Sequence, residues 1–355
     1  MKDTLFIYPH DEVKLPYDYH FSHNLAVRLY DDLVWILKDK ATQNKINVKI
    51  QFKDNNKLQE NEEDIIGWLL QNGYNKEVDE IVSKHLTFAI ISDICHYVYQ
   101  ALNSSKNIKM TVAFTLIRKP FLENLLIIEQ LLTDEKAFLD KFEKDATNFD
   151  PGKISVENKK ELINKSLEKI STNYLLTSDI IYALRWDKDN ENSIYANTNL
   201  ATHLVTTRNS SYKTENQNLN MIFSGFDEWD SQLAYFYYFV PLLLFYMTEI
   251  IDQYLLEKKI ITLKKFKERK FFRLLGQMLQ HDQFDEKSLK GKTTINSLVK
   301  NLKVKCKNCN KVNQLYKSDL YYIVHEDYLL CKHCLSDLIY ETDSLREMIS
   351  KLIQK

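Results

Sequence analysis

Apolar residues recur every three or four positions along most of the chain, which is the spacing of one face of an α-helix. A first helix is predicted over residues 19–40, whose apolar stripe consists of Leu25, Leu29, Leu33 and Ile36. Residues 42–63 are polar and rich in Asn and Lys, and they predict a loop. The helical spacing resumes at Asp64, and a long helix is expected over residues 77–102.

Two later segments are too apolar to be surface helices. Residues 110–132 are apolar on almost every side and predict a central buried helix, with an N-cap for a shorter helix at residues 133–136. Residues 233–247 form a continuous apolar run in which tyrosine hydroxyls are the only polar side-chain groups. This run is shorter than the roughly 20 apolar residues that span a bilayer. We therefore expect a buried helix kinked at Pro241 and no membrane span.

The remaining pattern divides the chain into four segments. Further helices are expected over residues 156–170, 175–186, 194–205, 260–280 and 344–353. The predicted segments are an N-terminal arm, helix and polar loop (1–63), a helical core (64–257), a basic helix and linker (258–297), and a cysteine-bearing module with a C-terminal helix (298–355). The last boundary rests on Gly291.

The composition supports a helical protein. Only 6 of the 355 residues are Gly and 5 are Pro, whereas an average chain of this length has about 12% of the two together. Doubly wound sheets and barrels need glycine at their turns, so these enzyme folds are disfavoured. The fold class predicted is mainly α, a multi-helix bundle with a small C-terminal β-hairpin zinc module.

The net charge of −1 conceals an uneven distribution of charge. Residues 258–311 hold 16 Lys and Arg against four acidic residues, whereas residues 1–257 are acidic by 11 charges. A basic segment between acidic ones is typical of a protein with a polyanionic partner.

Four cysteines carry the clearest chemical pattern. Two Cys-x-x-Cys pairs, in which two residues separate the thiols, lie 21 residues apart and consist of Cys306, Cys309, Cys331 and Cys334. Four thiolates at this spacing form a closed tetrahedral site, which is typical of one structural zinc ion and resembles a zinc ribbon or treble clef. Residues 316–330 between the pairs are rich in β-formers and predict a hairpin. Few cysteines in a long chain suit a reducing cytoplasm.

The basic helix leaves two interpretations open. It carries Lys264, Lys265, Lys267, Arg269, Lys270 and Arg273, and Lys305 and Lys307 continue the basic character into the first cysteine pair. These side chains either bind the phosphates of a nucleic acid or pair with the acidic helical core.

Two polar clusters interrupt the helical core. Arg118 and Glu123 lie in the apolar segment 110–132, and Asn199 and His203 share one helix face at i,i+4 spacing. Each cluster either stabilises the helical core through polar contacts or belongs to a catalytic site, in which His203 is a candidate general acid or base.

An Arg/Glu-bearing core helix followed by an Asn-x3-His helix resembles the HEPN superfamily of bacterial helical domains, over residues 75–256. The resemblance implies a possible homodimer and, in many members, a metal-independent ribonuclease of defence or toxin systems. The family's Arg-x4-6-His motif is not present: Arg185 is the nearest arginine before His203, and Arg118 could replace it only in space.

The function predicted is nucleic-acid binding, with RNA favoured, by a HEPN-like cytoplasmic protein. Whether it is an enzyme is left open; if it is, we expect an endoribonuclease with His203, Asn199, Arg118 and Arg185 in its site. The alternative is a non-catalytic scaffold that binds a protein partner through its zinc module.

Overall fold

The computed structural model describes residues 4–52, 64–170, 176–207, 209–222, 224–286, 299, 302–326 and 329–338. Within these ranges the chain is mainly α-helical, with one short antiparallel hairpin near its C-terminal end. The α-helices are α1 (His20–Lys38), α2 (Lys40–Gln43), α3 (Ile65–Gln71), α4 (Asn75–Lys106), α5 (Met110–Lys119), α6 (Leu125–Lys144), α7 (Val156–Ile170), α8 (Ser178–Arg185), α9 (Ile194–Thr202), α10 (Phe226–Glu257), α11 (Leu263–Glu286) and α13 (Lys317–Glu326). The strands are β1 (Lys303–Lys305) and β2 (Val312–Gln314), and short turns of other helical types are η1 (Tyr17–Tyr19), η2 (Pro120–Asn124), η3 (Ala146–Phe149), η4 (Pro151–Lys153) and η5 (Ser210–Tyr212).

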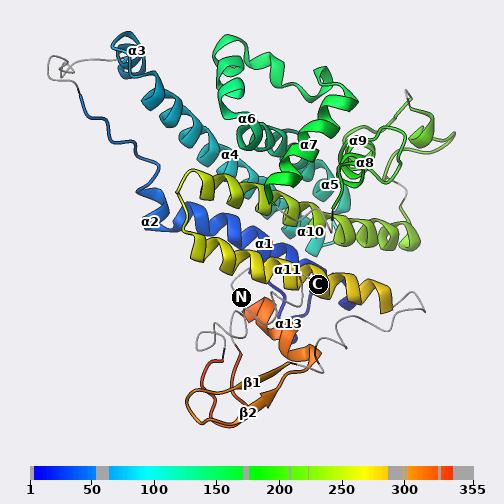
Figure 1. The fold of residues 1–355 in the computed structure, drawn as a ribbon. Coiled ribbons are helices and arrows are strands. Elements are labelled where there is room, and N and C mark those ends of the chain that lie inside the picture. The colour runs from blue at the N-terminus through cyan, green and yellow to red at the C-terminus, as the bar shows by residue number, and fades with distance from the viewer. Residues whose placement is uncertain are drawn as a thin grey trace.

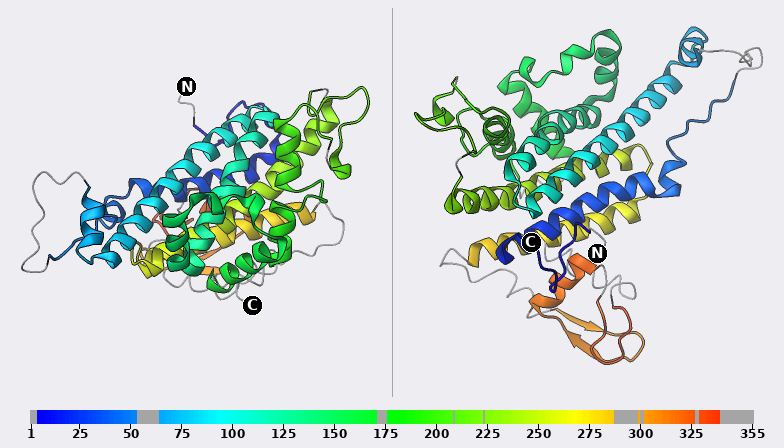
Figure 2. Two further views of the ribbon diagram at one scale, coloured as in Figure 1. Left: turned by 90° about the horizontal axis from the view of Figure 1, so that it is seen from above. Right: turned by 180° about the vertical axis from the view of Figure 1, so that it is seen from behind.

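The helices are arranged around a layer formed by α1, α10 and α11 (Figure 1). Helices α4 to α9 cover one side of this layer, and the hairpin with α13 lies on the other side, as the view from behind also shows (Figure 2). Helix α3 lies at the outer end of α4, where Leu69, Tyr74 and Val78 form a small separate apolar cluster.

Most predicted helices are present. The segment 110–132 is helical but not central, because α5 leaves Val112 exposed. From Pro120 to Asn124 the backbone widens into the π-helical turn η2. Proline has no N–H and clashes with the preceding turn, which accounts for a local change of helical type at this point. The predicted cap is confirmed, because Asp134 leaves helical geometry and its carboxylate accepts from Ala137 N–H at 3.0 Å.

Helix α10 occupies the centre instead, and it is the helix predicted from the apolar run. By length and composition α10 could cross a membrane, but 72% of its most apolar window is buried inside the protein. Pro241 leaves the carbonyl of Tyr237 without its helical donor. Gln280 of α11 donates to that carbonyl at 2.8 Å, and Gln277 donates to the carbonyl of Pro241 at 3.3 Å. The side chains of α11 therefore complete the hydrogen bonding of α10 at its proline.

The prediction of a hairpin over residues 316–330 is wrong. Residues 317–326 form helix α13, because Leu320, Ile323 and Val324 lie on one helical face that packs against α1 and α11. Tertiary burial of that face outweighs the β preference of the individual residues. A hairpin is present before these residues. Its strands β1 and β2 lie on either side of the first cysteine pair, with Val304 opposite Asn313.

The module containing β1, β2 and α13 packs closely onto the helical layer. A Cβ at Gly276 of α11 would lie 2.4 Å from Leu25 Cδ1 of α1 and 3.5 Å from Val324 Cγ1 of α13. Phe21 of α1 contacts Tyr321 edge-on at 4.6 Å between ring centroids. The boundary at Gly291 and the predicted helix 344–353 lie outside the described residues.

Candidate metal centre and basic surfaces

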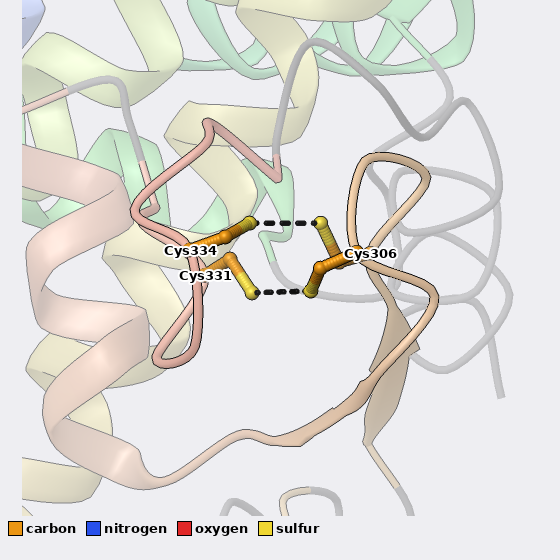
Figure 3. A group of neighbouring side chains, drawn as sticks. Cys306, Cys331 and Cys334 are labelled. Atoms are coloured by element: carbon orange, nitrogen blue, oxygen red, sulfur yellow. Dashed lines mark hydrogen bonds between the residues drawn. The ribbon is translucent and has the colours of Figure 1, made fainter.

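The four cysteine thiols converge on one point between two short loops. The sulfur atoms of Cys306 and Cys334 are 3.6 Å apart, those of Cys309 and Cys331 are 3.7 Å apart, and all four lie within 4.8 Å of one another. Figure 3 shows the two pairs facing each other. A tetrahedron with Zn–S bonds of about 2.3 Å has sulfur–sulfur edges of about 3.8 Å, whereas a disulfide would need about 2.05 Å. The thiols therefore fit a metal ion and are not arranged as disulfides.

The two loops have the same backbone geometry although their sequences differ. Asn310 N–H donates to the carbonyl of Cys306, and Leu335 N–H donates to the carbonyl of Cys331, each at 2.9 Å. Asn310 and Leu335 follow the second cysteine of their pairs, and both adopt left-handed backbone, with φ of 59° and 61°. Such a conformation is unfavourable for a non-glycine residue, particularly leucine. Its repetition indicates that both loops are shaped to direct two thiols toward one ion.

Polar groups around Cys331 and Cys334 favour the thiolate form that a metal requires, whereas hydrogen bonding among the thiols raises the pKa of Cys309 to about 11. The buried amide of Asn313 donates to Cys331 Sγ at 3.4 Å, and the hydroxyl of Ser336 lies 3.1 Å from Cys334 Sγ. Desolvation alone would raise the pKa of Cys331, but hydrogen bonds from the backbone N–H of His333 and from Asn313 lower that pKa to about 6. The described residues thus contain a site that could hold a metal ion.

The basic helix α11 is divided between solvent and core. Lys264 and Lys267 are exposed, and Lys265 is partly exposed, with its ammonium 4.7 Å from the centroid of the Trp35 ring. Arg269 and Arg273, in contrast, are 4% and 1% exposed. As placed, these two arginines cannot reach a nucleic acid, so their assignment as phosphate-binding residues is corrected.

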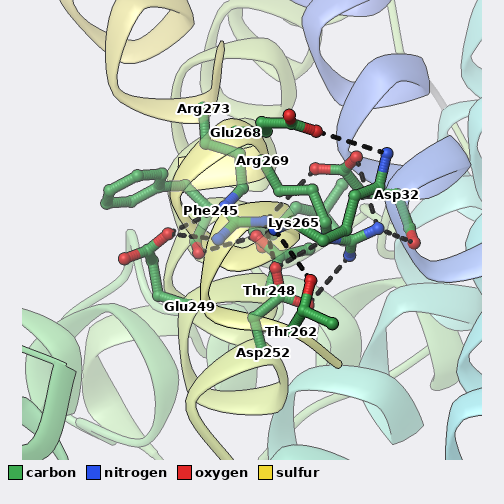
Figure 4. Close-up of polar contacts among 11 residues, drawn as sticks. Asp32, Phe245, Thr248, Glu249, Asp252, Thr262, Lys265, Glu268, Arg269 and Arg273 are labelled. Atoms are coloured by element: carbon green, nitrogen blue, oxygen red, sulfur yellow. Dashed lines mark hydrogen bonds and ion pairs between the residues drawn. The ribbon is translucent and has the colours of Figure 1, made fainter. Parts of the chain in front are cut away.

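The buried arginines take part in an ion network with acidic residues of α1 and α10 (Figure 4). Arg269 makes two hydrogen bonds to the carboxylate of Asp252, at 2.7 and 2.9 Å, and donates to the backbone carbonyl of Asp32 at 2.8 Å. Arg273 donates to Glu249 at 2.8 Å and to Asp252 at 2.6 Å. Two-point arginine–carboxylate pairs are strong and directional. These contacts support the interpretation that α11 pairs with the acidic core.

Lys270 belongs to the same network. Its ammonium lies 3.2 Å from Glu249 and donates to the carbonyl of Ile170 at 2.7 Å. Burial alone would raise the pKa of Asp252, but the guanidinium groups of Arg269 and Arg273 outweigh it and hold that pKa below its usual range. The helical spacing could have revealed the network, because Arg269 and Arg273 share a face with the buried Phe266.

A second basic surface lies on the cysteine module. It consists of the exposed residues Lys303, Lys305, Lys307 and Lys311, which we call the lysine hairpin. Lys303 and Lys305 project outward on either side of the buried Val304, as strand alternation requires. No acidic residue occurs between positions 302 and 318. The lysine hairpin is therefore a surface of one charge sign attached to the cysteine site.

Of the four candidate catalytic residues, the structure brings Arg118 and Asn199 into contact. The guanidinium of Arg118 in α5 donates to Asn199 Oδ1 at 3.0 Å and to Thr198 Oγ1 at 3.1 Å, although α9 lies 80 positions further along the chain. His203 follows as the C-cap of α9; it is exposed, and its backbone N–H donates to the carbonyl of Asn199. Arg118, Asn199 and His203 thus lie near the same end of α9.

Arg185 is placed elsewhere, and Glu123 is exposed. Arg185 is 0% exposed, pairs with Glu129 at 2.6 Å and donates to the carbonyl of Phe121 at 2.8 Å. The hydroxyl of Tyr246 donates to the same Glu129 oxygen at 2.7 Å. Arg185 therefore joins core helices, and its assignment to a catalytic group with His203 is corrected.

Comparisons with known proteins add no relative. No protein-family model, curated protein or solved structure matches the chain. What the chain does must therefore be inferred from its own residues.

Proposed function

We propose that the chain binds nucleic acid, with RNA favoured, through the lysine hairpin of a zinc-stabilised module. The observation that carries the proposal is the row of exposed lysines without any acidic residue, held on a hairpin whose loop supplies two of the metal ligands. A rigid array of ammonium groups matches the regular spacing of backbone phosphates, and binding releases counterions.

A single strand is favoured because the module that carries the lysine hairpin also carries exposed aromatic side chains. Tyr316 and Tyr322 are 58% and 54% exposed, and Lys332 places its ammonium 4.4 Å from the centroid of the Tyr316 ring. Unpaired bases stack on such rings, whereas the bases of a duplex are covered by their neighbours. A surface with both phosphate-binding and base-stacking groups suits an unpaired strand.

The metal of the module is proposed to be one structural zinc ion. Four thiolates select a soft or borderline metal and leave no open coordination position for chemistry. Zinc would hold the two loops together and so fix the lysine hairpin against α13. Reduced thiols are maintained in the cytoplasm, which is the location we propose.

The zinc proposal predicts one zinc ion per chain in protein purified without chelator. Cys331→Ser should lose the ion, because its thiolate cannot be replaced by another donor at the same place, whereas Cys95→Ala, at a buried thiol of α4, should keep it. Atomic emission measures both. Absence of zinc from the unaltered protein would contradict the proposal.

RNA binding is tested by removing charge from the lysine hairpin. The variant Lys303→Gln/Lys305→Gln/Lys307→Gln should weaken binding to a single-stranded RNA and reduce the slope of log affinity against log salt by about two, at about 0.7 per phosphate contact. A matched control removes three exposed lysines of the helical body, by Lys109→Gln, Lys144→Gln and Lys213→Gln. Fluorescence anisotropy at several salt concentrations measures the slopes. Equal slopes in the two variants would refute the proposal, and a protein partner of the module would then be the alternative to pursue.

RNA cleavage is a second candidate function, favoured by the contact between Arg118 and Asn199 and by the exposed His203, whose backbone N–H donates to the Asn199 carbonyl. A HEPN-like site would use His203 as acid or base and Arg118 to stabilise the charged transition state. RNA turnover in EDTA should then be lost in His203→Ala and in Arg118→Ala. Turnover that survives both changes would exclude this site, and absence of turnover would leave RNA binding alone.

A further inference from the structure

A positively charged aromatic cluster lies between α7 and α8, apart from both surfaces described above. Its centre is the indole of Trp186, which is 4% exposed. The guanidinium carbon of Arg185 lies 3.7 Å from the centroid of the Trp186 ring, and the ammonium of Lys159 lies 5.3 Å from it. Two cations thus approach one buried ring.

The two cations differ in how their charge is compensated. Arg185 pairs with Glu129, whose carboxylate also accepts from Tyr246. Lys159 is 9% exposed, and its ammonium makes no hydrogen bond or ion pair with the residues that the structure describes. A buried ammonium without a carboxylate partner is unfavourable unless another group compensates it.

A third cation lies close enough to act on Lys159. Lys188 is exposed in the loop after α8, and its ammonium lies 5.6 Å from the centroid of the Tyr195 ring. Burial lowers the pKa of Lys159, and the charges of Lys188 and Arg185 lower it further, against a smaller opposing effect of the Asp150 carboxylate. Glu129 pairs with Arg185, whereas Lys159 and Lys188 have no hydrogen-bonded carboxylate among the described residues, and Asp150 acts on Lys159 only through its more distant charge.

Hydrogen-bond donors in the cluster are also unused. Trp186 Nε1 and Arg185 Nη2 are both buried, and neither has an acceptor within the described parts of the chain. Nearly all buried donors in proteins are paired, so two adjacent orphans beside an unpaired ammonium indicate a ligand that supplies acceptors.

We infer that this cluster binds the phosphate group of a ligand, with Lys159, Lys188 and Trp186 Nε1 as the residues that contact it. A phosphate monoester carries close to two negative charges at neutral pH and several strong acceptor oxygens, which matches both the two unpaired ammonium groups and the unused donors. The site goes beyond RNA binding by the lysine hairpin and does not depend on it.

The test uses inorganic phosphate as the probe and Trp186 as the reporter. Potassium phosphate, compared with potassium chloride at equal ionic strength, should change the indole fluorescence and raise the melting temperature of the full chain. Trp186→Phe should remove the fluorescence change. Lys159→Met should weaken phosphate binding about tenfold or more, because it loses a charge-assisted hydrogen bond.

The matched control is Lys160→Met, which changes the neighbouring lysine that pairs with Asp179 at 2.7 Å on the protein surface. This variant should bind phosphate like the unaltered protein. Without phosphate, Lys159→Met should melt no lower than the unaltered protein, because it removes an unpaired buried charge; a folded variant is therefore available for the test. An absent phosphate effect in the unaltered protein, or an equal effect in Lys159→Met, would overturn the inference.

The source of the phosphate is distinguished by competition. Two RNAs of the same sequence are compared, one with a 5′-phosphate and one without. If only the RNA that carries the 5′-phosphate displaces inorganic phosphate, the site binds an RNA end. Failure of both to compete would assign it to a small phosphate compound. The variant of the lysine hairpin should keep the phosphate response, so failure of one proposal does not entail failure of the other.

Discussion

The buried ion network between α10 and α11 gives the sharpest prediction about stability. Arg273→Met removes one of three cations, Arg269, Lys270 and Arg273, that face the carboxylates of Asp32, Glu249 and Asp252. Methionine fills much of the same volume but leaves one negative charge without a partner. Breaking a buried ion pair by removing one member costs about 3–5 kcal/mol, and we expect a loss of that size.

Urea unfolding at neutral pH, followed by circular dichroism, measures the loss. The control is Lys267→Met on the exposed side of the same helix, which should not change the unfolding midpoint measurably. A loss below about 1 kcal/mol in Arg273→Met would refute the structural interpretation of this residue. Normal stability combined with weaker RNA binding would instead place Arg273 at a phosphate.

The pH dependence provides an independent check of the same reasoning. The pKa of Asp252 lies below its usual range in the folded protein, so its stabilising contribution is present above the unfolded pKa of about 3.9 and is lost as the pH falls through the folded value. In Arg273→Met this pKa should rise, and the contribution should vanish at a higher pH. The difference in stability between the two proteins should therefore narrow on acidification; a constant difference would contradict the charge-based explanation.

Two further predictions concern buried polar groups. Gln280→Leu should lower the free energy of unfolding by about 1–3 kcal/mol, because the carbonyl of Tyr237 loses its donor. The loss should be smaller in a Pro241→Ala background, where residue 241 regains an N–H that can bond this carbonyl. Urea unfolding measures both losses, and equal losses in the two backgrounds would contradict the explanation. Burial lowers the pKa of His23 and of His325 to about 4. Between pH 6.5 and 4 each histidine therefore binds a proton only when the protein unfolds. As the pH falls through this window, the free energy of unfolding should decrease by about 3 kcal/mol for each histidine. Urea unfolding across the window measures the fall, and an imidazole that titrates near 6.5 in the folded protein, seen by NMR, would disprove the assignment.

Local signals in the sequence were sufficient for most helices and for the candidate metal site. Helix α7 begins at the predicted residue 156 and continues to residue 170, the last described residue of that range, because its apolar positions recur without interruption and no proline interferes. The cysteine site was predictable because ligand spacing within each pair is a local property of a short loop. Neither conclusion depends on what the rest of the chain does.

Partners far apart in the sequence could not be predicted in the same way. The sequence shows Arg269 and Arg273 as basic residues in a basic segment, and only packing against α1 and α10 shows that acidic residues enclose them. Likewise, residues 317–326 contain strand-forming side chains, but they form a helix whose apolar face is buried against α11 and α1.

The sequence by itself determined the helical character of the protein, the position of its buried apolar helix and the four thiols of its candidate metal site, because periodicity and short spacings are encoded locally. The tertiary structure alone decided which charges are available at the surface. It buried two arginines of α11, joined Arg118 to Asn199 and left Lys159 beside Trp186 without a carboxylate. The physical reason is that the energy of a charge depends on its neighbours and its exposure, and both are set by contacts between distant segments.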